Sequence, residues 1–210
     1  NPFQAHGIPN ARDTLKHIKK DSNRTMVVFD PRVTETAKQA DIHVQLKPGT
    51  DAYLMSAMIA IMLRENLYDQ QFIQKHTHGF DEVKQAFLAI PIEEYIQKAD
   101  VSVEQIYQIV RDFAKAKRGC VRIDLGIQHT LNTTLNGYLE KLLYLLAGHF
   151  GQQGTNNLHT MFIPILTHTD ERNPKYRRTV HHKMFPISGF FPPNILPDEI
   201  LKAGEKRVRA

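Results

Sequence analysis

The sequence predicts an α/β fold in which a mostly parallel sheet is flanked by helices. Three kinds of pattern predict it: short β-branched runs typical of buried strands, amphipathic stretches of helical length between them, and glycines or prolines where one pattern gives way to the other. Strands that alternate with helices of this length indicate βαβ units with right-handed crossovers. At 210 residues, the chain is long enough to bury a substantial core.

Three short strands are expected. Residues 25–30 form an apolar, β-branched run that ends in an acid and follows a polar helical stretch over residues 11–20. Residues 43–47 alternate between apolar and polar side chains, and a Pro-Gly pair ends this second strand. Residues 120–125 are predicted to form the third strand.

Helices are expected between and after these strands. Residues 52–66 are apolar on nearly every face, which is typical of a helix packed on a sheet and covered from outside. Residues 67–99 contain two or three short helical patterns and no strand pattern, so they are expected to form an insertion over the sheet. Regularly spaced leucines over residues 135–146 predict another amphipathic helix.

The most specific local signal is a capping box. Ser102 and Gln105 stand three residues apart at the start of an apolar periodic stretch, so a helix is predicted over residues 103–117. Gly119 is expected to close it. The glycines at positions 148, 151 and 154 follow a helix and do not precede one, which favours a helix C-cap and turn over a phosphate-binding loop.

Two parts of different character are predicted, an α/β domain over residues 1–154 and an extended, proline-rich, basic segment over residues 155–210. The second part carries nine Lys or Arg against five Asp or Glu, which is most of the chain's formal charge of +5. A helix is expected in it only over residues 198–206. Because the cations are not interleaved with aromatic side chains on one face, no nucleic-acid partner is expected.

The cellular setting is only weakly indicated. The single cysteine, Cys120, excludes an intrachain disulfide and a cysteine-built metal site, and it is expected to be a small buried residue at the start of the third strand. The longest apolar stretch, residues 54–63, is far shorter than the roughly 20 residues that span a bilayer. No targeting segment precedes Asn1 in this sequence. A cytoplasmic protein without a membrane partner is therefore expected.

Ligands of open parallel sheets lie outside the carboxyl ends of the strands, so the residues that follow each expected strand are candidate site residues. The chain carries these motifs in order: Asn1-Pro2, Asp30-Pro31-Arg32 with Thr34-Glu35-Thr36-Ala37, Lys47-Pro48-Gly49-Thr50-Asp51, Leu67-Tyr68-Asp69, Thr77-His78-Gly79-Phe80, Gly126-Ile127-Gln128-His129, and the glycines Gly148, Gly151 and Gly154. In this order the motifs resemble those of the molybdopterin oxidoreductase family, which contains formate dehydrogenases, nitrate reductases and dimethyl sulfoxide reductase. Each motif is unspecific alone, but their collinear order over residues 1–154 is specific.

The resemblance implies a Rossmann-like fold and a site for molybdopterin guanine dinucleotide carrying molybdenum or tungsten. It implies that Asp30, Pro31, Arg32, Val33 and Thr34 line the guanosine, that Gly49, Thr50 and Asp51 hold the guanine base, that Gln128 contacts the pterin, and that Asn1 and Pro2 begin a cofactor-contacting loop. A carboxylate suits guanine because its two oxygens accept from the adjacent ring N–H and exocyclic amine together.

Other roles are open for the same residues. Thr50 or Asp51 is equally well placed as a helix N-cap, and an Asp-Pro pair at position 30 is a common turn opener. Arg32 suits a phosphate or an ordinary surface ion pair. Gln128 is also unremarkable as a polar residue of a loop.

No catalytic residue and no metal ligand is expected in this chain. The histidine pair at positions 181 and 182 lacks a third ligand at any recognisable spacing. The function predicted is that of an internal fragment of a bacterial-type molybdopterin oxidoreductase, inactive alone, whose partner is the remainder of the parent chain. The alternative is a cofactor-free interaction module with the same fold, since fold alone does not determine function.

Overall fold

The computed structural model describes residues 1–4, 10–157, 178–186 and 190–202, and the chain divides into two compact units, residues 1–158 and 159–210. The first unit is mixed α/β and largely helical. The predicted division into an α/β cofactor-binding domain over residues 1–154 and an extended, proline-rich segment over residues 155–210 stays a prediction.

In the described residues of the first unit, the sheet consists of two parallel strands, β1 (Val27–Phe29) and β2 (Ile42–Val44). Their register pairs Val27 with Ile42 and Phe29 with Val44. Both strands are shorter than the predicted runs. β1 lies within residues 25–30, and β2 begins one residue before the predicted run of residues 43–47 and ends at Val44. The connection between them contains only the short 3₁₀ helix η1 (Ala37–Gln39), and helix α1 (Ala11–Lys20), predicted at these positions, precedes β1.

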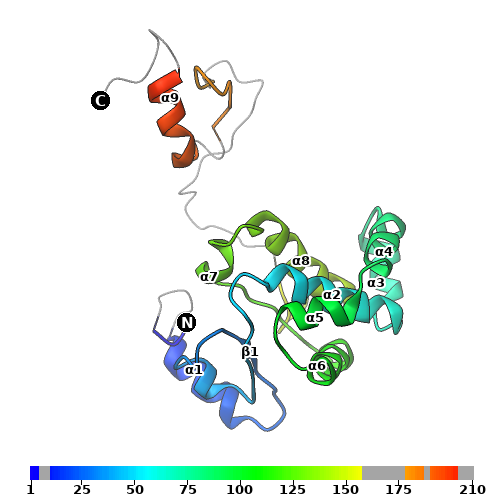
Figure 1. Ribbon diagram of the computed structural model, residues 1–210. Coiled ribbons are helices and arrows are strands. Elements are labelled where there is room, and N and C mark those ends of the chain that lie inside the picture. Colours follow the sequence, from blue (N-terminus) through cyan, green and yellow to red (C-terminus); the bar gives the residue numbers. More distant parts are fainter. Residues whose placement is uncertain (5–9, 158–177, 187–189, 203–210) are drawn as a thin grey trace. The chain divides into compact units, whose positions relative to one another are not determined.

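Helix α2 (Asp51–Arg64) is the centre of the core (Figure 1). Its side chains from Leu54 to Leu63 are all buried, as the apolar pattern of residues 52–66 predicts. It packs against α4, α5, α6 and α8. The helices that follow α2 in the first unit are α3 (Gln70–His76), α4 (Phe80–Leu88), α5 (Ile92–Lys98), α6 (Val103–Lys115), α7 (Leu125–Gln128) and α8 (Thr133–Leu146).

The sheet joins this helical core through β2. Val44 and Leu46 are buried within the core, and the backbone N–H of Lys47 donates to the carbonyl of Ala99 over 2.9 Å. This attachment holds the end of β2 and therefore the turn that leads into α2. The three short helices α3, α4 and α5 confirm the helices predicted between residues 67 and 99. They pack on α2 and α8, whereas the sequence predicted that they would lie over the sheet.

Two helix ends confirm local sequence signals. Ser102 Oγ accepts from the backbone N–H of Gln105 at 3.2 Å, so the predicted cap of α6 is formed. At the end of α8, Gly148 has φ +69°, and its N–H donates to Leu145 while the N–H of His149 donates to the carbonyl of Tyr144. This pair of bonds is a Schellman motif, which explains the glycine at position 148.

The third predicted strand, residues 120–125, is wrong: these residues form neither a strand nor a helix up to Asp124. The amide of Asn156 pairs with both backbone groups of Val121, at 2.8 Å each, and so replaces the bonds of a neighbouring strand. Asp124 then caps α7, because its Oδ1 accepts from the N–H of Leu125 at 3.0 Å. Side-chain hydrogen bonds here compete successfully with strand pairing.

Two further sequence expectations for this region are corrected. Cys120 is exposed, because the segment that carries it is not a buried strand. Gly119 does not close α6, which ends at Lys115 with an extended residue, Ala116, after it. A Cβ at position 119 would lie 2.7 Å from the ring of His149, so the glycine is needed for close packing.

The second unit is described over residues 178–186 and 190–202. It contains the 3₁₀ helix η2 (Pro193–Ile195) and helix α9 (Leu196–Lys202), and the predicted continuation of this helix to Lys206 lies outside the described residues. Glu199 of α9 is buried, and burial alone raises a carboxyl pKa. Hydrogen bonds from the backbone of His181, His182 and Val180 and from the Thr179 side chain outweigh this effect and lower the pKa of Glu199 to about 2.

Among the residues that the structure describes, no helix is both long and apolar enough to cross a membrane.

Candidate functional site

The parallel arrangement of β1 and β2 places two predicted segments at one edge of the sheet. Asp30 directly follows β1, and its N–H donates to the carbonyl of Val44 at the end of β2. The turn at Gly49–Asp51 comes after β2 in the same direction. The carboxyl ends of both strands therefore lead into the residues singled out from the sequence, at the edge where ligands of parallel sheets bind.

Asp30 builds the loop that follows its strand. Its Oδ1 accepts from the N–H of Arg32 at 2.9 Å, and its Oδ2 lies 3.5 Å from the hydroxyl of Thr34. The backbone carbonyl of Asp30 lies 2.8 Å from His43 Nε2, and Gln45 donates to the carbonyl of Pro31 at 2.9 Å. The turn-opening role considered for Asp30 is thus present.

The loop exposes the side chains between Asp30 and Thr34. Pro31, Arg32 and Val33 are exposed, and Val33 keeps 59% of its surface accessible. Among the described residues, Arg32 has no carboxylate within ion-pair distance, although its charge helps to lower the pKa of Glu35. Its guanidinium is therefore available to a ligand at the sheet edge.

Asn1 and Pro2 lie against the end of this loop. The amide of Asn1 donates to Glu35 Oε2 and accepts from the hydroxyl of Thr36, both at 2.7 Å. The N–H of Phe3 donates to the same hydroxyl at 3.0 Å. The pKa of Glu35 is lowered, first by its own backbone N–H and then by Asn1. The structure thus brings the predicted residues Asn1 and Pro2 to the loop that begins at Asp30.

Asp124 connects a third segment to this cluster. The backbone nitrogen of Asn1 lies 3.9 Å from Asp124 Oδ2. Within the described residues, this oxygen is buried and has no hydrogen-bond partner. Asp124 starts α7, at whose other end Gln128 is exposed. Gln128 therefore belongs to a segment that reaches the cluster, but it is the last residue of a short helix and does not follow the strand that the sequence predicted.

The turn after β2 is open above its glycine. Gly49 has φ +80°, and a Cβ at this position would meet nothing within 4 Å. Thr50 stands at the N-cap position of α2, yet its hydroxyl donates to the carbonyl of Lys47 at 2.6 Å and does not cap the helix. The N-cap explanation for its side chain is therefore wrong.

Asp51 is the first residue of α2 and is half-buried. Burial raises the pKa of its carboxyl group above the ordinary value, although its own backbone N–H acts in the other direction. Within residues 1–4 and 10–157, no other side chain donates a hydrogen bond to this carboxylate and no cation pairs with it. Both carboxylate oxygens therefore retain the capacity to accept from a ligand.

Glu35, Thr36 and Asp124 also lie at this edge but were not predicted as site residues, although the first two belong to one of the family motifs. The signal for the first two was present, since they continue the polar run after Arg32. For Asp124, the available signal was its position before a short apolar run, which is typical of a helix cap, but the predicted strand concealed it.

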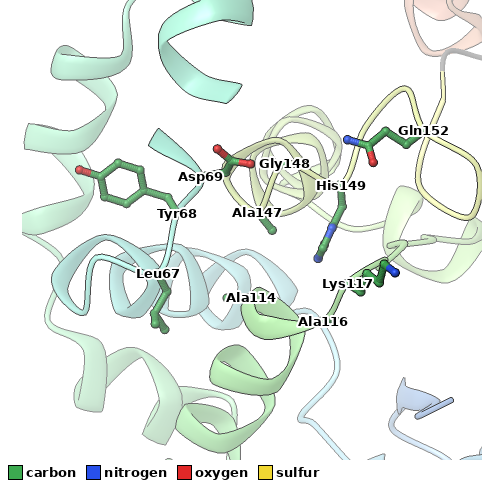
Figure 2. A pocket seen from close by; sticks show the side chains of 10 residues that line it. All are labelled: Leu67, Tyr68, Asp69, Ala114, Ala116, Lys117, Ala147, Gly148, His149 and Gln152. Atoms are coloured by element: carbon green, nitrogen blue, oxygen red, sulfur yellow. The ribbon is translucent and has the colours of Figure 1, made fainter. Parts of the chain in front are cut away.

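A separate pocket of about 340 Å³ lies between the N-terminus of α3 and the ends of α6 and α8 (Figure 2). It is lined by Leu67, Tyr68, Asp69, Ala114, Ala116, Lys117, Ala147, Gly148, His149 and Gln152. None of the site residues predicted from the sequence lines this pocket. Two of its polar side chains are engaged in structure: Asp69 caps α3, and His149 Nε2 lies 3.0 Å from the carbonyl of Phe113.

Comparisons with known proteins show which family the chain resembles. The family model "Molybdopterin oxidoreductase" matches residues 1–186. The chain is 33% identical over 135 residues to the assimilatory nitrate reductase catalytic subunit of Bacillus subtilis (strain 168), covering 63% of this chain and 19% of that protein. It is 33% identical over 154 residues to formate dehydrogenase H of Escherichia coli (strain K12), covering 72% of this chain and 21% of that protein.

A solved structure is also similar. Acetylene hydratase from Pelobacter acetylenicus superposes with a TM-score of 0.59 and 26% sequence identity, over 62% of this chain and 18% of that one. The chain thus spans about a fifth of the length of the relatives it matches. Since the family model covers most of the sequence, the chain belongs to the molybdopterin oxidoreductase family.

Proposed function

We propose that this chain supplies part of the site that holds the guanine dinucleotide end of a molybdopterin cofactor within a larger oxidoreductase. The observation that carries the proposal is Asp51, whose half-buried carboxylate lies after β2 without a side-chain partner among the described residues. Burying an ionised carboxylate costs free energy unless hydrogen-bond donors satisfy its oxygens, and a ligand could supply those donors.

The residues at the sheet edge fit such a ligand. Asp124 Oδ2 is a buried acceptor without a hydrogen-bond partner in the described part of the chain, and the space above Gly49 is open. Asp51 offers two acceptor oxygens to the paired donors of guanine, which adenine lacks. Gln128 offers an amide that both donates and accepts, as a pterin edge does.

Each residue has a binding role in this proposal. Asp30, Pro31, Arg32, Val33 and Thr34 form the loop beside the guanosine, with Arg32 available to a phosphate. Gly49, Thr50 and Asp51 form the turn that receives the base, and Gln128 contacts the pterin. Asn1 and Pro2 close one side of the loop through Thr36. When bound, the metal-dithiolene group supplies the redox chemistry. This chain's residues bind and orient it, and we assign none of them a catalytic role.

The rest of the site is proposed to come from the remainder of a parent chain, because the matched relatives are about five times as long as the matched segment. In that context we propose that β1 and β2 belong to a larger, Rossmann-like parallel sheet. Substrate and reaction would be determined by those other segments. The expectations of a cytoplasmic location and of no nucleic-acid partner stay predictions.

The test compares nucleotides as probes of the base site. Guanosine diphosphate and adenosine diphosphate are titrated into the chain by calorimetry, and guanosine diphosphate is expected to bind more tightly. Asp51→Asn replaces one acceptor oxygen by a donor, so it is expected to remove about 1–3 kcal/mol of this preference, which is about 5- to 150-fold in affinity. The matched control is Asp81→Asn, an exposed acid in the first turn of α4, which is expected to leave the preference unchanged.

Two outcomes would contradict the proposal. Equal affinity for the two nucleotides, or a guanine preference that survives Asp51→Asn, would show that Asp51 does not recognise the base. No binding of either nucleotide tighter than about 1 mM would favour the alternative, a cofactor-free interaction module with the same fold.

A further inference from the structure

A buried carboxylate organises one loop of the second unit. Glu199 Oε2 accepts from the backbone N–H of Val180 and of His181, both at 2.9 Å, and Oε1 accepts from the N–H of His182 at 2.8 Å. Glu199 is only 5% exposed. Three bonds from consecutive N–H groups to one side chain fix the backbone of this loop against α9.

The loop presents two imidazoles to the residue beside Glu199. One ring nitrogen of His181, one of His182 and one oxygen of Asp198 all lie within 4.8 Å of one another. His182 Nε2 is 3.3 Å from Asp198 Oδ2, and the two rings meet edge to face with centroids 4.8 Å apart. Both histidines are exposed, so solvent reaches the group.

The carboxylate of Asp198 is divided between two partners. Lys202, one helical turn later, lies 2.8 Å from Oδ1, whereas Oδ2 faces His182. The lysine therefore holds one oxygen and orients the carboxylate, and the other oxygen remains directed at the imidazoles. Orientation of a ligating carboxylate by an outer partner is a common feature of metal sites.

The donor set indicates the class of ligand. Two imidazole nitrogens and one carboxylate oxygen suit zinc and similar divalent transition metals, whereas magnesium and calcium prefer oxygen ligands alone. Ligands bound tetrahedrally to zinc at about 2.0–2.2 Å lie about 3.3–3.6 Å apart. The pair His182 and Asp198 already has this separation, and a small rotation of the exposed His181 ring would bring the third atom in.

We propose that His181, His182 and Asp198 bind one divalent transition-metal ion, with zinc as the type case, and that water completes its coordination. This site is distinct from the pterin site, because it involves none of the residues at the sheet edge. The sequence did not predict it, since Asp198 stands far along the chain from the histidine pair, and the fold brings them together through Glu199.

The test uses the full chain, freed of metal by a chelator and titrated with zinc chloride in a calorimeter. About one zinc ion per chain is expected to bind at the tightest site. His182→Ala and Asp198→Asn are each expected to weaken this event by at least about tenfold, because each removes a direct ligand. The matched controls are His78→Ala and Asp81→Asn, which change an exposed histidine and an exposed acid of the first unit and are expected to have no effect.

A second measurement locates the ion without relying on a folded variant. Long-range nitrogen–proton NMR spectra of the unmodified chain follow each histidine ring during the titration. The ring nitrogens of His181 and His182 are expected to shift first and to saturate together. The proposal is overturned if no zinc binds, if other histidines respond first, or if the ligand variants bind zinc as the controls do; the three side chains would then form an ordinary ion-paired cluster.

Discussion

At the scale of single residues, Asp51 is unfavourable for the stability of the fold. Burial raises the pKa of its carboxyl group above the ordinary value of 3.8, so the ionised form is less stable in the folded chain than in the unfolded one. The protonated group contributes stability that is fully present below 3.8 and is lost as the pH rises through the raised folded pKa. A neutral side chain at this position would avoid the free-energy cost of burying the charge.

Asp51→Asn is therefore expected to raise the stability of the chain at neutral pH. The gain should shrink as the pH falls and disappear below 3.8, where the wild-type carboxyl is protonated in both states. Urea unfolding midpoints measured over this pH range check it. Asp81→Asn, the control, removes only a favourable charge from a helix N-terminus and should slightly destabilise. A loss of stability in Asp51→Asn like that in the control would show that Asp51 serves the helix and not a ligand.

At the scale of elements, the contacts at helix ends explain particular residues of the sequence better than the helix interiors do. The helix α8 ends in a Schellman motif at Gly148, and the next residue, His149, packs its ring on Phe113 with centroids 5.0 Å apart. A Cβ on Gly148 would lie 2.6 Å from Asp69 Oδ2, the carboxylate that caps α3. Gly148 therefore allows the end of α8 to pack closely against the start of α3.

Gly148→Ala is expected to destabilise the first unit by at least about 1–2 kcal/mol, the cost of a left-handed conformation in a residue with a Cβ. The displaced Asp69 adds to this cost. Gly137→Ala, within α8, is the matched control, since nothing lies within 4 Å of its added Cβ and its φ is not positive. It should be neutral or stabilising by up to about 1 kcal/mol. Chemical unfolding distinguishes the two, and equal effects would contradict the role given to Gly148.

At the scale of the whole molecule, the decisive fact is the share of each relative that the chain covers, 19% and 21% for the nitrate reductase and formate dehydrogenase. The residues assigned here to the cofactor lie at a sheet edge made of two strands in the described part of the chain. The dinucleotide cofactor that we propose would need surfaces beyond that edge.

The chain expressed alone in cells that make the molybdenum cofactor is accordingly expected to purify without molybdenum or tungsten and without redox activity. Elemental mass spectrometry measures the metal content, and a full-length relative purified from the same cells serves as the positive control. About one molybdenum or tungsten per chain would show that this segment binds the complete cofactor by itself, contrary to the proposed division of the site.

Several features of this protein could be predicted from the sequence alone. The apolar pattern of α2, the cap at Ser102 and the glycine after α8 are all visible in patterns of residues close in the chain, and each was predicted correctly. The family was predicted too, because its motifs recur in a fixed order that no single motif could establish. The helices between residues 67 and 99 followed from local periodicity.

Only the tertiary structure decided the features that depend on distant partners. Residues 120–125 have the composition of a strand, yet Asn156 takes the backbone bonds of Val121 and leaves Cys120 exposed. Asp198 meets the histidine pair only because Glu199 holds their backbone. Hydrogen bonds between residues far apart in the chain have no periodic trace in a sequence, and they compete with local propensity on equal terms.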